Sequence, residues 1–284
     1  MSNIKYSIVI PAKNEEKGLE LLIPKLLEYA ASEIIVVSDG SSDRTQEVAE
    51  HYGCKVIVHE ISMGNGAAIK AGAREACEDV ILFMDADYQH DPKNIPDLLE
   101  TYKKGRDMVV GARQGQKSQA NIARGFGNKL YNKFASWMVG QEIHDLTSGF
   151  RVVNKKKFLT FLHLLPNGFS YPTTITMAFF RAGYKVEYFF LDMPKRIGKS
   201  HLNLFKDGPK FFLIIFKIGT LYSPLKIFMP IALAHLILGL GYYTFTYITE
   251  GRFTNMSALL LSNAVLIFLI GLVSEQIANL TYKP

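Results

Sequence analysis

Two carboxylates stand one residue apart at the end of an apolar run. Residues 80–84 read VILFM, Asp85 and Asp87 follow, and Gln89 lies two positions further on. The run predicts a buried strand, and open α/β sheets bind ligands at the carboxyl ends of strands. Carboxylate and amide oxygens at this spacing suit a hard cation such as Mg²⁺ or Mn²⁺. A solvated acidic turn is the alternative, because short acidic patterns are common.

The pattern of the first 115 residues predicts the elements that position these carboxylates. The expected strands are 6–12, 33–39, 54–60, 79–85 and 108–111, and the expected helices are 15–30, 43–52, 65–77 and 93–104. Such alternation favours a mainly parallel sheet covered by helices. Polar residues follow the strand ends: Lys13, Asn14 and Glu15, then Asp39 to Asp43, then Asp85 to Gln89, then Arg113. We therefore expect several loops to meet at one edge of the sheet.

Two loops, at residues 39–43 and 63–68, have both a structural and a binding interpretation. Residues 39–43 read DGSSD, which suits a turn and helix cap and also offers polar groups to a ligand. Residues 63–68 read MGNGAA, which predicts either a phosphate site at a helix N-terminus or close packing of helix against strand. The spacing of its glycines matches neither G-x-G-x-x-G nor the P-loop.

Composition favours one large domain with an appendage in a reducing compartment. The chain has 284 residues, of which 48% are hydrophobic. Cys54 and Cys77 are its two cysteines, too few for a disulfide framework. The apolar run at 8–10 is soon followed by Pro11 and Lys13, so it lacks the longer core of a secretory signal. We expect the catalytic part to lie in the cytosol.

The net charge of +6 is concentrated in one segment. Between residues 195 and 226 the difference between basic and acidic residues is 7 − 1 = +6, from Lys195, Arg196, Lys199, Lys206, Lys210, Lys217 and Lys226 against Asp207. Large apolar residues, such as those at 211–216, stand among these charges. Basic and apolar side chains together favour an anionic membrane surface as the partner, and not nucleic acid.

Two uncharged stretches follow, at 227–248 and 256–274. At about 1.5 Å per residue, helices of this length can cross a bilayer core of roughly 30 Å. Two buried helices of a soluble core are the alternative. The short connection at 249–255 predicts a hairpin, and the lysines before the first stretch place both of its ends in the cytoplasm.

Seven motifs follow one another along the chain. They are IPAKNEE (10–16), VVSDGSSDRT (36–45), GNGAAIKAG (64–72), MDADYQHDP (84–92), VVGAR (109–113), DLTSGFR (145–151) and KRIGKSH (195–201). Their order resembles the family 2 glycosyltransferases, in particular the polyprenyl-phosphate branch with dolichyl-phosphate mannose synthases and bacterial glucosyl-transferring relatives. The resemblance covers about residues 4–205, and the hairpin in architecture only. It implies an α/β GT-A (Rossmann-like) domain with a C-terminal two-helix transmembrane hairpin, and an inverting transfer from a nucleotide-diphosphate sugar.

The resemblance also implies roles for single residues. Around the base and ribose it places Pro11, Lys13, Glu15, Val37 and Asp39, with Asp39 as the polar reader of the base. At the metal, Mg²⁺ or Mn²⁺, and the donor diphosphate it places Asp85, Ala86, Asp87 and Gln89. Arg113 is expected to reach a donor or acceptor phosphate, and the lipid phosphate is expected to meet Lys195, Arg196, Lys199 and Ser200. Catalysis is assigned to Asp87, Arg113, Arg196 and Lys199. Lys13 and Tyr88 differ from residues common in relatives, which leaves base and sugar open.

The predicted function is transfer of a hexose to a dolichyl or undecaprenyl phosphate on the cytoplasmic face of the cell membrane. Such a phosphate is already an anion near neutral pH, so it needs alignment and charge compensation more than a strong base. The alternatives are a hydroxyl acceptor, with Asp145 as candidate base, and a catalytically idle membrane scaffold. The expected parts are a cytosolic GT-A domain at 1–200, a basic amphipathic segment at 201–224 and a transmembrane hairpin at 225–284.

Overall fold

The computed structural model describes residues 4–113, 122–168, 170–191 and 219–281, with only the backbone described for 122–130. It divides into two compact units. The first consists of residues 1–133 and 141–199, and the second of residues 134–140 and 200–284.

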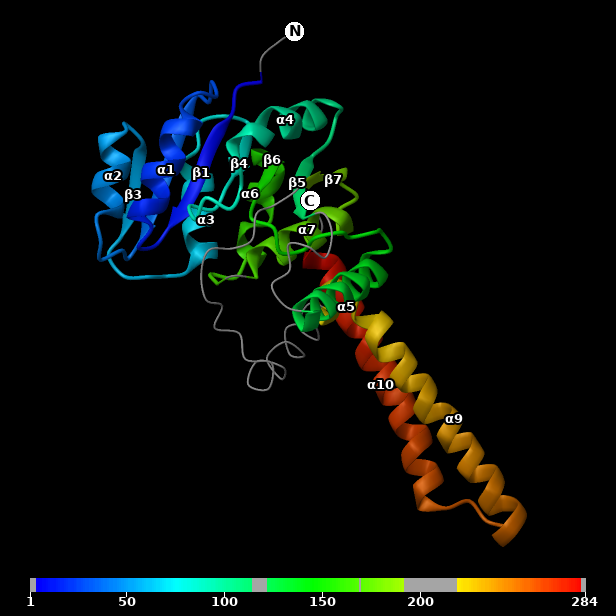
Figure 1. Ribbon diagram of the computed structural model, residues 1–284. Helices are drawn as coiled ribbons and strands as arrows, with labels where there is room; N and C mark the ends of the chain where they lie inside the picture. The colour runs from blue at the N-terminus through cyan, green and yellow to red at the C-terminus, as the bar shows by residue number, and fades with distance from the viewer. Residues whose placement is uncertain (1–3, 114–121, 169, 192–218, 282–284) are drawn as a thin grey trace. The chain divides into compact units, whose positions relative to one another are not determined.

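A mixed sheet forms the centre of the first unit (Figure 1). Its strands are β1 (Ser7–Ala12), β2 (Glu33–Asp39), β3 (Lys55–His59), β4 (Val80–Phe83), β5 (Met108–Arg113), β6 (Arg151–Asn154) and β7 (Val186–Leu191), in the order β3-β2-β1-β4-β6-β5-β7. β1 pairs in parallel with β2 and β4, β2 with β3, and β5 with β7. β6 runs antiparallel between β4 and β5. The expected mainly parallel sheet is therefore confirmed, with one antiparallel strand that the pattern did not indicate.

The helices of the first unit connect these strands. They are α1 (Glu16–Leu26), α2 (Thr45–His51), α3 (Asn65–Glu75), α4 (Ile95–Lys103), α6 (Lys155–Thr160) and α7 (Tyr171–Arg181), with 3₁₀ turns at Pro92–Asn94 and Leu162–Leu164. A longer helix, α5 (Ile122–Val139), runs from the first unit into residues of the second. The buried side chains of α1 are Leu19, Leu22, Ile23 and Leu26, the spacing of one helix face.

The core lies on both faces of the central strands. Ile8, Val9 and Ile10 are all fully buried, although successive strand residues point to opposite faces. Burial on both faces explains why β1 and β4 read as continuous apolar runs. At Gly72 of α3 an added Cβ would lie 2.3 Å from a methyl of Val9, so α3 packs closely onto the sheet.

In the second unit the helices α9 (Pro224–Glu250) and α10 (Asn255–Thr281) run antiparallel, side by side (Figure 1). Each has 27 residues, or about 40 Å of helix. Both are long and apolar enough to cross a membrane, with mean hydropathies of 1.7 and 2.4. Only 11% and 17% of their apolar windows are buried, unlike core helices of a soluble protein. Gly251, at φ 67°, ends α9 in the left-handed conformation that glycine favours.

Candidate functional site

The loops after β1 and β2 meet at the carboxyl edge of the sheet. Asn14 Oδ1 accepts a hydrogen bond from the backbone of Ser42 at 2.8 Å. The backbone N–H of Glu15 donates to Thr45 Oγ1 at 2.9 Å, and that of Glu16 donates to Asp43 Oδ2 at 3.2 Å. The DGSSD segment therefore joins two loops as well as leading into α2. These contacts hold the start of α1 against the end of β2.

Asp39 organises the loop that follows β3. Its Oδ1 accepts hydrogen bonds from His59 Nδ1 at 2.7 Å and from the backbone of Met63 at 2.9 Å. Its Oδ2 accepts from Ser62 Oγ and from the backbone of Gly64, both at 2.8 Å. Burial raises the pKa of the Asp39 carboxyl, but these four hydrogen bonds outweigh it and lower the pKa from 3.8 to about 2. An ionised carboxylate has about four acceptor sites, so Asp39 has little capacity left to accept further hydrogen bonds from the base of a nucleotide.

The MGNGAA segment packs against another loop. An added Cβ on Gly64 would lie 2.5 Å from the carbonyl oxygen of Asn167, and one on Gly66 would lie 2.1 Å from that of Pro166. The backbone N–H of Ala67 donates to the same Asn167 oxygen at 3.1 Å. Close packing thus accounts for these glycines, and the first turn of α3 directs the N–H of Ala67 at a carbonyl of the neighbouring loop.

Asp85 and Asp87 follow β4 on a sharp turn of the chain. The backbone N–H of Gln89 donates to Asp87 Oδ1 at 3.1 Å. Tyr88, between them, has φ 55°, a left-handed conformation that is uncommon for a bulky residue. Its hydroxyl group and the Lys25 ammonium are hydrogen-bonded. Backbone outliers of this kind cluster at ligand sites.

The backbone of Gly149 lies directly against the carboxylate of Asp85. A Cβ at this glycine would lie 2.5 Å from Asp85 Oδ2 and 2.8 Å from Oδ1. Ser148 fixes this loop, because its Oγ donates to the carbonyl of Gly111 on β5 at 2.6 Å. Only glycine therefore leaves room for Asp85 in its present position.

The donor set at this edge suits Mg²⁺ or Mn²⁺. Asp85 and Asp87 bring two carboxylates and Gln89 an amide oxygen, and all three side chains are half-buried. Within the described ranges, no three His, Cys, Asp or Glu side chains gather into a metal-binding group. Two carboxylates suffice for Mg²⁺ where substrate phosphates and waters complete the shell. The close approach of Gly149, which lets the Asp85 carboxylate take its present position, agrees with such a site.

At the end of β5, Arg113 forms an ion pair with Asp145. Arg113 Nε donates to Asp145 Oδ2 at 2.8 Å, and Nη2 donates to Oδ1 at 3.0 Å. Burial raises the pKa of Asp145, but the hydrogen bonds and the charge of Arg113 lower this pKa by a larger amount, so the net shift is downward. Burial lowers the pKa of Arg113, and Asp145 raises it by more. The Arg113 side chain remains 36% exposed, so its outer edge is accessible to an anion.

Arg151 is a functional candidate that the sequence analysis did not single out. It is fully buried, and Nη1 donates to the carbonyl of Pro172 at 3.2 Å and to Thr176 Oγ1 at 3.1 Å. Its Nη2 donates to the carbonyl of Ser148, next to Gly149. Burial lowers its pKa, and interactions with Tyr171 and Tyr188, then with the charges of Asp145 and Asp85, oppose that shift. The signal in the sequence was an arginine at the start of an apolar strand, where a buried charge is rare.

The remaining predicted residues occupy different environments. Lys13 is exposed, whereas Pro11 and Glu15 are half-buried. Val37 is fully buried, and its methyl group lies against Gly72 of α3, which makes it a core residue. Ala86 is buried, with its carbonyl against Gly18 of α1. Four predicted acceptor residues lie outside the described residues: Lys195, Arg196, Lys199 and Ser200.

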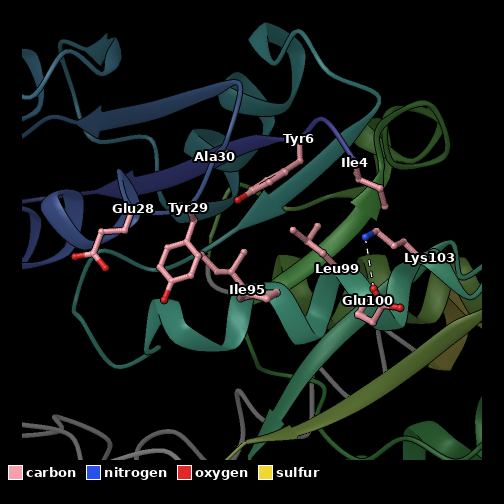
Figure 2. A pocket seen from close by; sticks show the side chains of 10 residues that line it. Ile4, Tyr6, Glu28, Tyr29, Ala30, Ile95, Leu99, Glu100 and Lys103 are labelled. Atoms are coloured by element: carbon pink, nitrogen blue, oxygen red, sulfur yellow. Dashed lines mark ion pairs between the residues drawn. The ribbon is translucent and has the colours of Figure 1, made fainter. Parts of the chain in front are cut away.

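A separate hollow of about 310 Å³ lies at the opposite edge of the sheet (Figure 2). It is lined by Tyr6, which precedes β1, and by Tyr29, Ile95 and Leu99. Of the motif residues that the structure describes, none lines this hollow, so it is distinct from the candidate site.

The comparisons with known proteins agree with this geometry. The family model described as glycosyl transferase family 2 matches residues 7–161. The chain belongs to this family. A second model, the GtrB C-terminal hairpin, matches residues 223–280. The expected GT-A fold with a C-terminal hairpin of apolar helices is therefore confirmed.

Two curated proteins are similar to the chain. The dolichol-phosphate mannosyltransferase of Pyrococcus furiosus is 37% identical over 180 residues, or 58% of this chain and 50% of that protein. The undecaprenyl-phosphate 4-deoxy-4-formamido-L-arabinose transferase of Pseudomonas paraeruginosa is 32% identical over 184 residues, 58% of this chain and 54% of that protein. The chain thus spans about half the length of these relatives. The predicted resemblance to the polyprenyl-phosphate branch of family 2 is confirmed.

Solved structures show the same fold at lower identity. Glucosyl-3-phosphoglycerate synthase from Mycobacterium tuberculosis, in complex with Mn²⁺, UDP-glucose and phosphoglyceric acid, has a TM-score of 0.60 and 19% identity. The match covers 76% of this family 2 chain and 80% of that one. At this identity the likeness concerns the fold alone.

Proposed function

We propose that the protein transfers a hexose, with inversion, from a nucleotide-diphosphate sugar to a dolichyl or undecaprenyl phosphate. The observation that carries the proposal is the combination, in one chain, of a family 2 catalytic domain with a GtrB C-terminal hairpin. The two relatives described above carry dolichol phosphate and undecaprenyl phosphate in their names. Their names give two different sugars, mannose and 4-deoxy-4-formamido-L-arabinose, so the choice of a hexose is our own proposal.

On the donor side, Asp85, Asp87 and Gln89 would hold Mg²⁺ or Mn²⁺ together with the diphosphate. When bound, the ion offsets the negative charge that develops on the departing nucleoside diphosphate. The chain contributes the position of these ligands, through Gly149 behind Asp85 and the left-handed turn at Tyr88. The base would lie along the joined loops after β1 and β2, near Lys13, Glu15 and the loop that Asp39 holds.

On the acceptor side, the state of Asp145 favours a phosphate over a hydroxyl group. A hydroxyl nucleophile needs a general base, whose pKa works best near the operating pH. The pKa of Asp145 is lowered, and both of its oxygens accept hydrogen bonds from Arg113. Such a carboxylate is a weak base and is well placed to orient an arginine. Arg113 would then contact a donor or acceptor phosphate, with Lys195, Arg196, Lys199 and Ser200 completing the acceptor site.

We further propose that the hairpin spans the cell membrane as a multi-pass anchor and that the catalytic domain is cytoplasmic. Residues 1–200 would form that domain, 201–224 a basic amphipathic segment and 225–284 the hairpin. The length and exposure of α9 and α10 support the span, and the basic residues before it support the orientation. Confinement to one surface would bring enzyme and lipid acceptor together.

The experiment is incubation of membranes containing the full chain with a panel of radiolabelled nucleotide sugars, followed by extraction of the lipid. We expect label from one donor to enter the polyprenyl-phosphate fraction in a reaction that EDTA stops. Membranes with the Asp87→Asn variant, in equal amount, serve as the control. Label from no donor at all would favour the idle scaffold.

A further inference from the structure

Near its C-terminal end, α5 carries an aromatic pair in which Trp137 is exposed and Phe134 is half-buried. Trp137 is the single tryptophan of the chain, and it is 49% exposed. Phe134 lies one turn earlier, with its ring centroid 5.8 Å from that of Trp137. Both belong to the second unit, which also contains the hairpin. An exposed tryptophan in the same unit as an apolar hairpin suits a contact with a membrane surface, where one end of the ring is apolar and the other is wet.

Three hydrogen bonds hold the end of α5 to the start of α9. Ser223 Oγ donates to the carbonyl of Met138 at 3.2 Å. The Lys226 ammonium donates to the carbonyls of Trp137 and Met138, each at 3.0 Å. A cation at the end of a helix satisfies its last carbonyls and interacts favourably with the helix dipole. Trp137 is thereby fixed at the level of the first turn of α9.

That level is a polar boundary of the hairpin. Glu275 of α10 accepts a hydrogen bond from the backbone of Leu225 at 3.2 Å. A carboxylate and the Lys226 ammonium therefore both lie at the end of the hairpin where α9 begins. At the other end, Glu250 pairs with Arg252 at 2.8 Å. The 24 residue-to-residue steps from Lys226 to Glu250 rise about 36 Å, somewhat more than a hydrocarbon core of roughly 30 Å. Both charged ends of α9 therefore fall in the headgroup regions.

We propose that Trp137, supported by Phe134, is an interfacial anchor whose indole lies among the lipid headgroups of the leaflet in which α9 begins. The inference rests on the proposed membrane hairpin and continues its lipid-facing surface onto α5. Tryptophan is enriched at this depth because its ring is apolar while its N–H still finds water or headgroup partners. The anchor fixes how deep the C-terminal turn of α5 sits in the leaflet.

The test uses the intrinsic fluorescence of Trp137, which no other tryptophan obscures. The full chain is reconstituted into vesicles of phosphatidylcholine and phosphatidylglycerol that carry bromine either near the headgroup or near the chain end. We expect shallow bromine to remove about half or more of the emission, deep bromine to remove much less, and aqueous iodide to have little effect.

Two variants calibrate the depth. Trp137→Phe with Leu27→Trp places the tryptophan directly after α1 in the first unit, at a residue that is 57% exposed, and we expect iodide alone to quench it. Trp137→Phe with Ile237→Trp places it in mid-span of α9, where we expect deep bromine to quench best.

Each result separates this inference from the proposed function. If the protein stays in the vesicles but Trp137 responds like Leu27→Trp, the indole lies in water and the anchor is wrong. If neither lipid bromine nor iodide quenches Trp137, a protein segment or a second copy covers it, which also overturns the proposal. If the protein does not sediment with the vesicles at all, the membrane hairpin itself fails.

Discussion

The carboxylate of Asp145 accepts two hydrogen bonds from the guanidinium of Arg113, one on each oxygen. The two residues are 32 positions apart, at the end of β5 and in the loop that leads to β6. The backbone N–H of Thr147 donates to Asp145 Oδ1 at 2.9 Å and fixes the carboxylate in turn. This bidentate geometry aims Arg113, because a planar guanidinium held at two nitrogens has little freedom to rotate.

We expect Asp145→Asn to lower kcat about 10- to 100-fold, with a smaller change in the KM for the donor, because an amide cannot hold the guanidinium on both sides. Transfer kinetics with saturating polyprenyl phosphate measure this. The control is Glu187→Gln, which breaks the ion pair of Glu187 with Arg106 away from the site. An Asp145→Asn enzyme as active as the Glu187→Gln enzyme would contradict an orienting role.

Gly149→Ala tests the position of Asp85. The new methyl group would lie 2.5 Å from Asp85 Oδ2, so the carboxylate must move while the backbone need not. We expect at least a hundredfold loss of transfer, which corresponds to about 3 kcal/mol in the barrier, with little loss of folded protein. The matched control is Gly168→Ala, where an added Cβ meets no atom within 4 Å. Equal activity of the two variants would mean that Asp85 tolerates displacement.

Asp87→Asn tests the metal assignment. The substitution removes one negative charge without changing volume, so the fold should persist while transfer falls more than a hundredfold, or about 3 kcal/mol in the barrier. Activity assays with added Mg²⁺ or Mn²⁺, and with EDTA, measure the effect. Near-normal transfer by the variant, or by the wild type with EDTA present, would remove the metal from the account.

The low pKa of Asp39 predicts a pH dependence of stability. Its folded value of about 2 lies below the ordinary value of 3.8, so its stabilisation is present above about pH 4 and is lost as the pH falls towards 2. The shift corresponds to about 2 kcal/mol as an order of magnitude.

Thermal unfolding of the full chain in detergent, between pH 7 and pH 3, measures this term. We expect Asp39→Asn to lower the Tm at pH 7 and to flatten its fall in acid. Asp97→Asn, at an exposed carboxylate on α4, should leave the profile unchanged. If Asp39→Asn follows the wild-type profile, the hydrogen bonds of Asp39 do not contribute to stability.

Local patterns predicted the first part of the fold well. The apolar runs that give β1, β2 and β4, and the spacing that gives α1, depend on residues close in sequence. The antiparallel β6 was not predicted, because its partners on β4 and β5 lie 41 to 74 residues earlier and no local signal encodes that pairing. The hairpin helices extend beyond 227–248 and 256–274, since each helix continues into the charged and polar residues that flank its uncharged stretch.

The candidate site was only partly readable from sequence. Asp85, Asp87 and Arg113 stand at strand ends, so their place at the edge followed from the strand pattern. The fully buried Val37 and the four hydrogen bonds to Asp39 follow from tertiary packing, which motif order does not specify. Gly149 and Arg151 were missed for the same reason, because their significance lies in contacts with Asp85 and with α7.

The acceptor specificity tests the central claim most directly. Purified full chain, the preferred nucleotide sugar and the metal are combined with a polyprenyl phosphate or with the corresponding neutral alcohol. We expect transfer to the phosphate alone. We also expect Arg196→Ala and Lys199→Ala each to raise the KM for the phosphate or to lower kcat, because each removes a contact worth about 1.5 to 3 kcal/mol. The affinity for the donor should change little. Equal use of the alcohol and the phosphate would contradict the account and make Asp145 the candidate base.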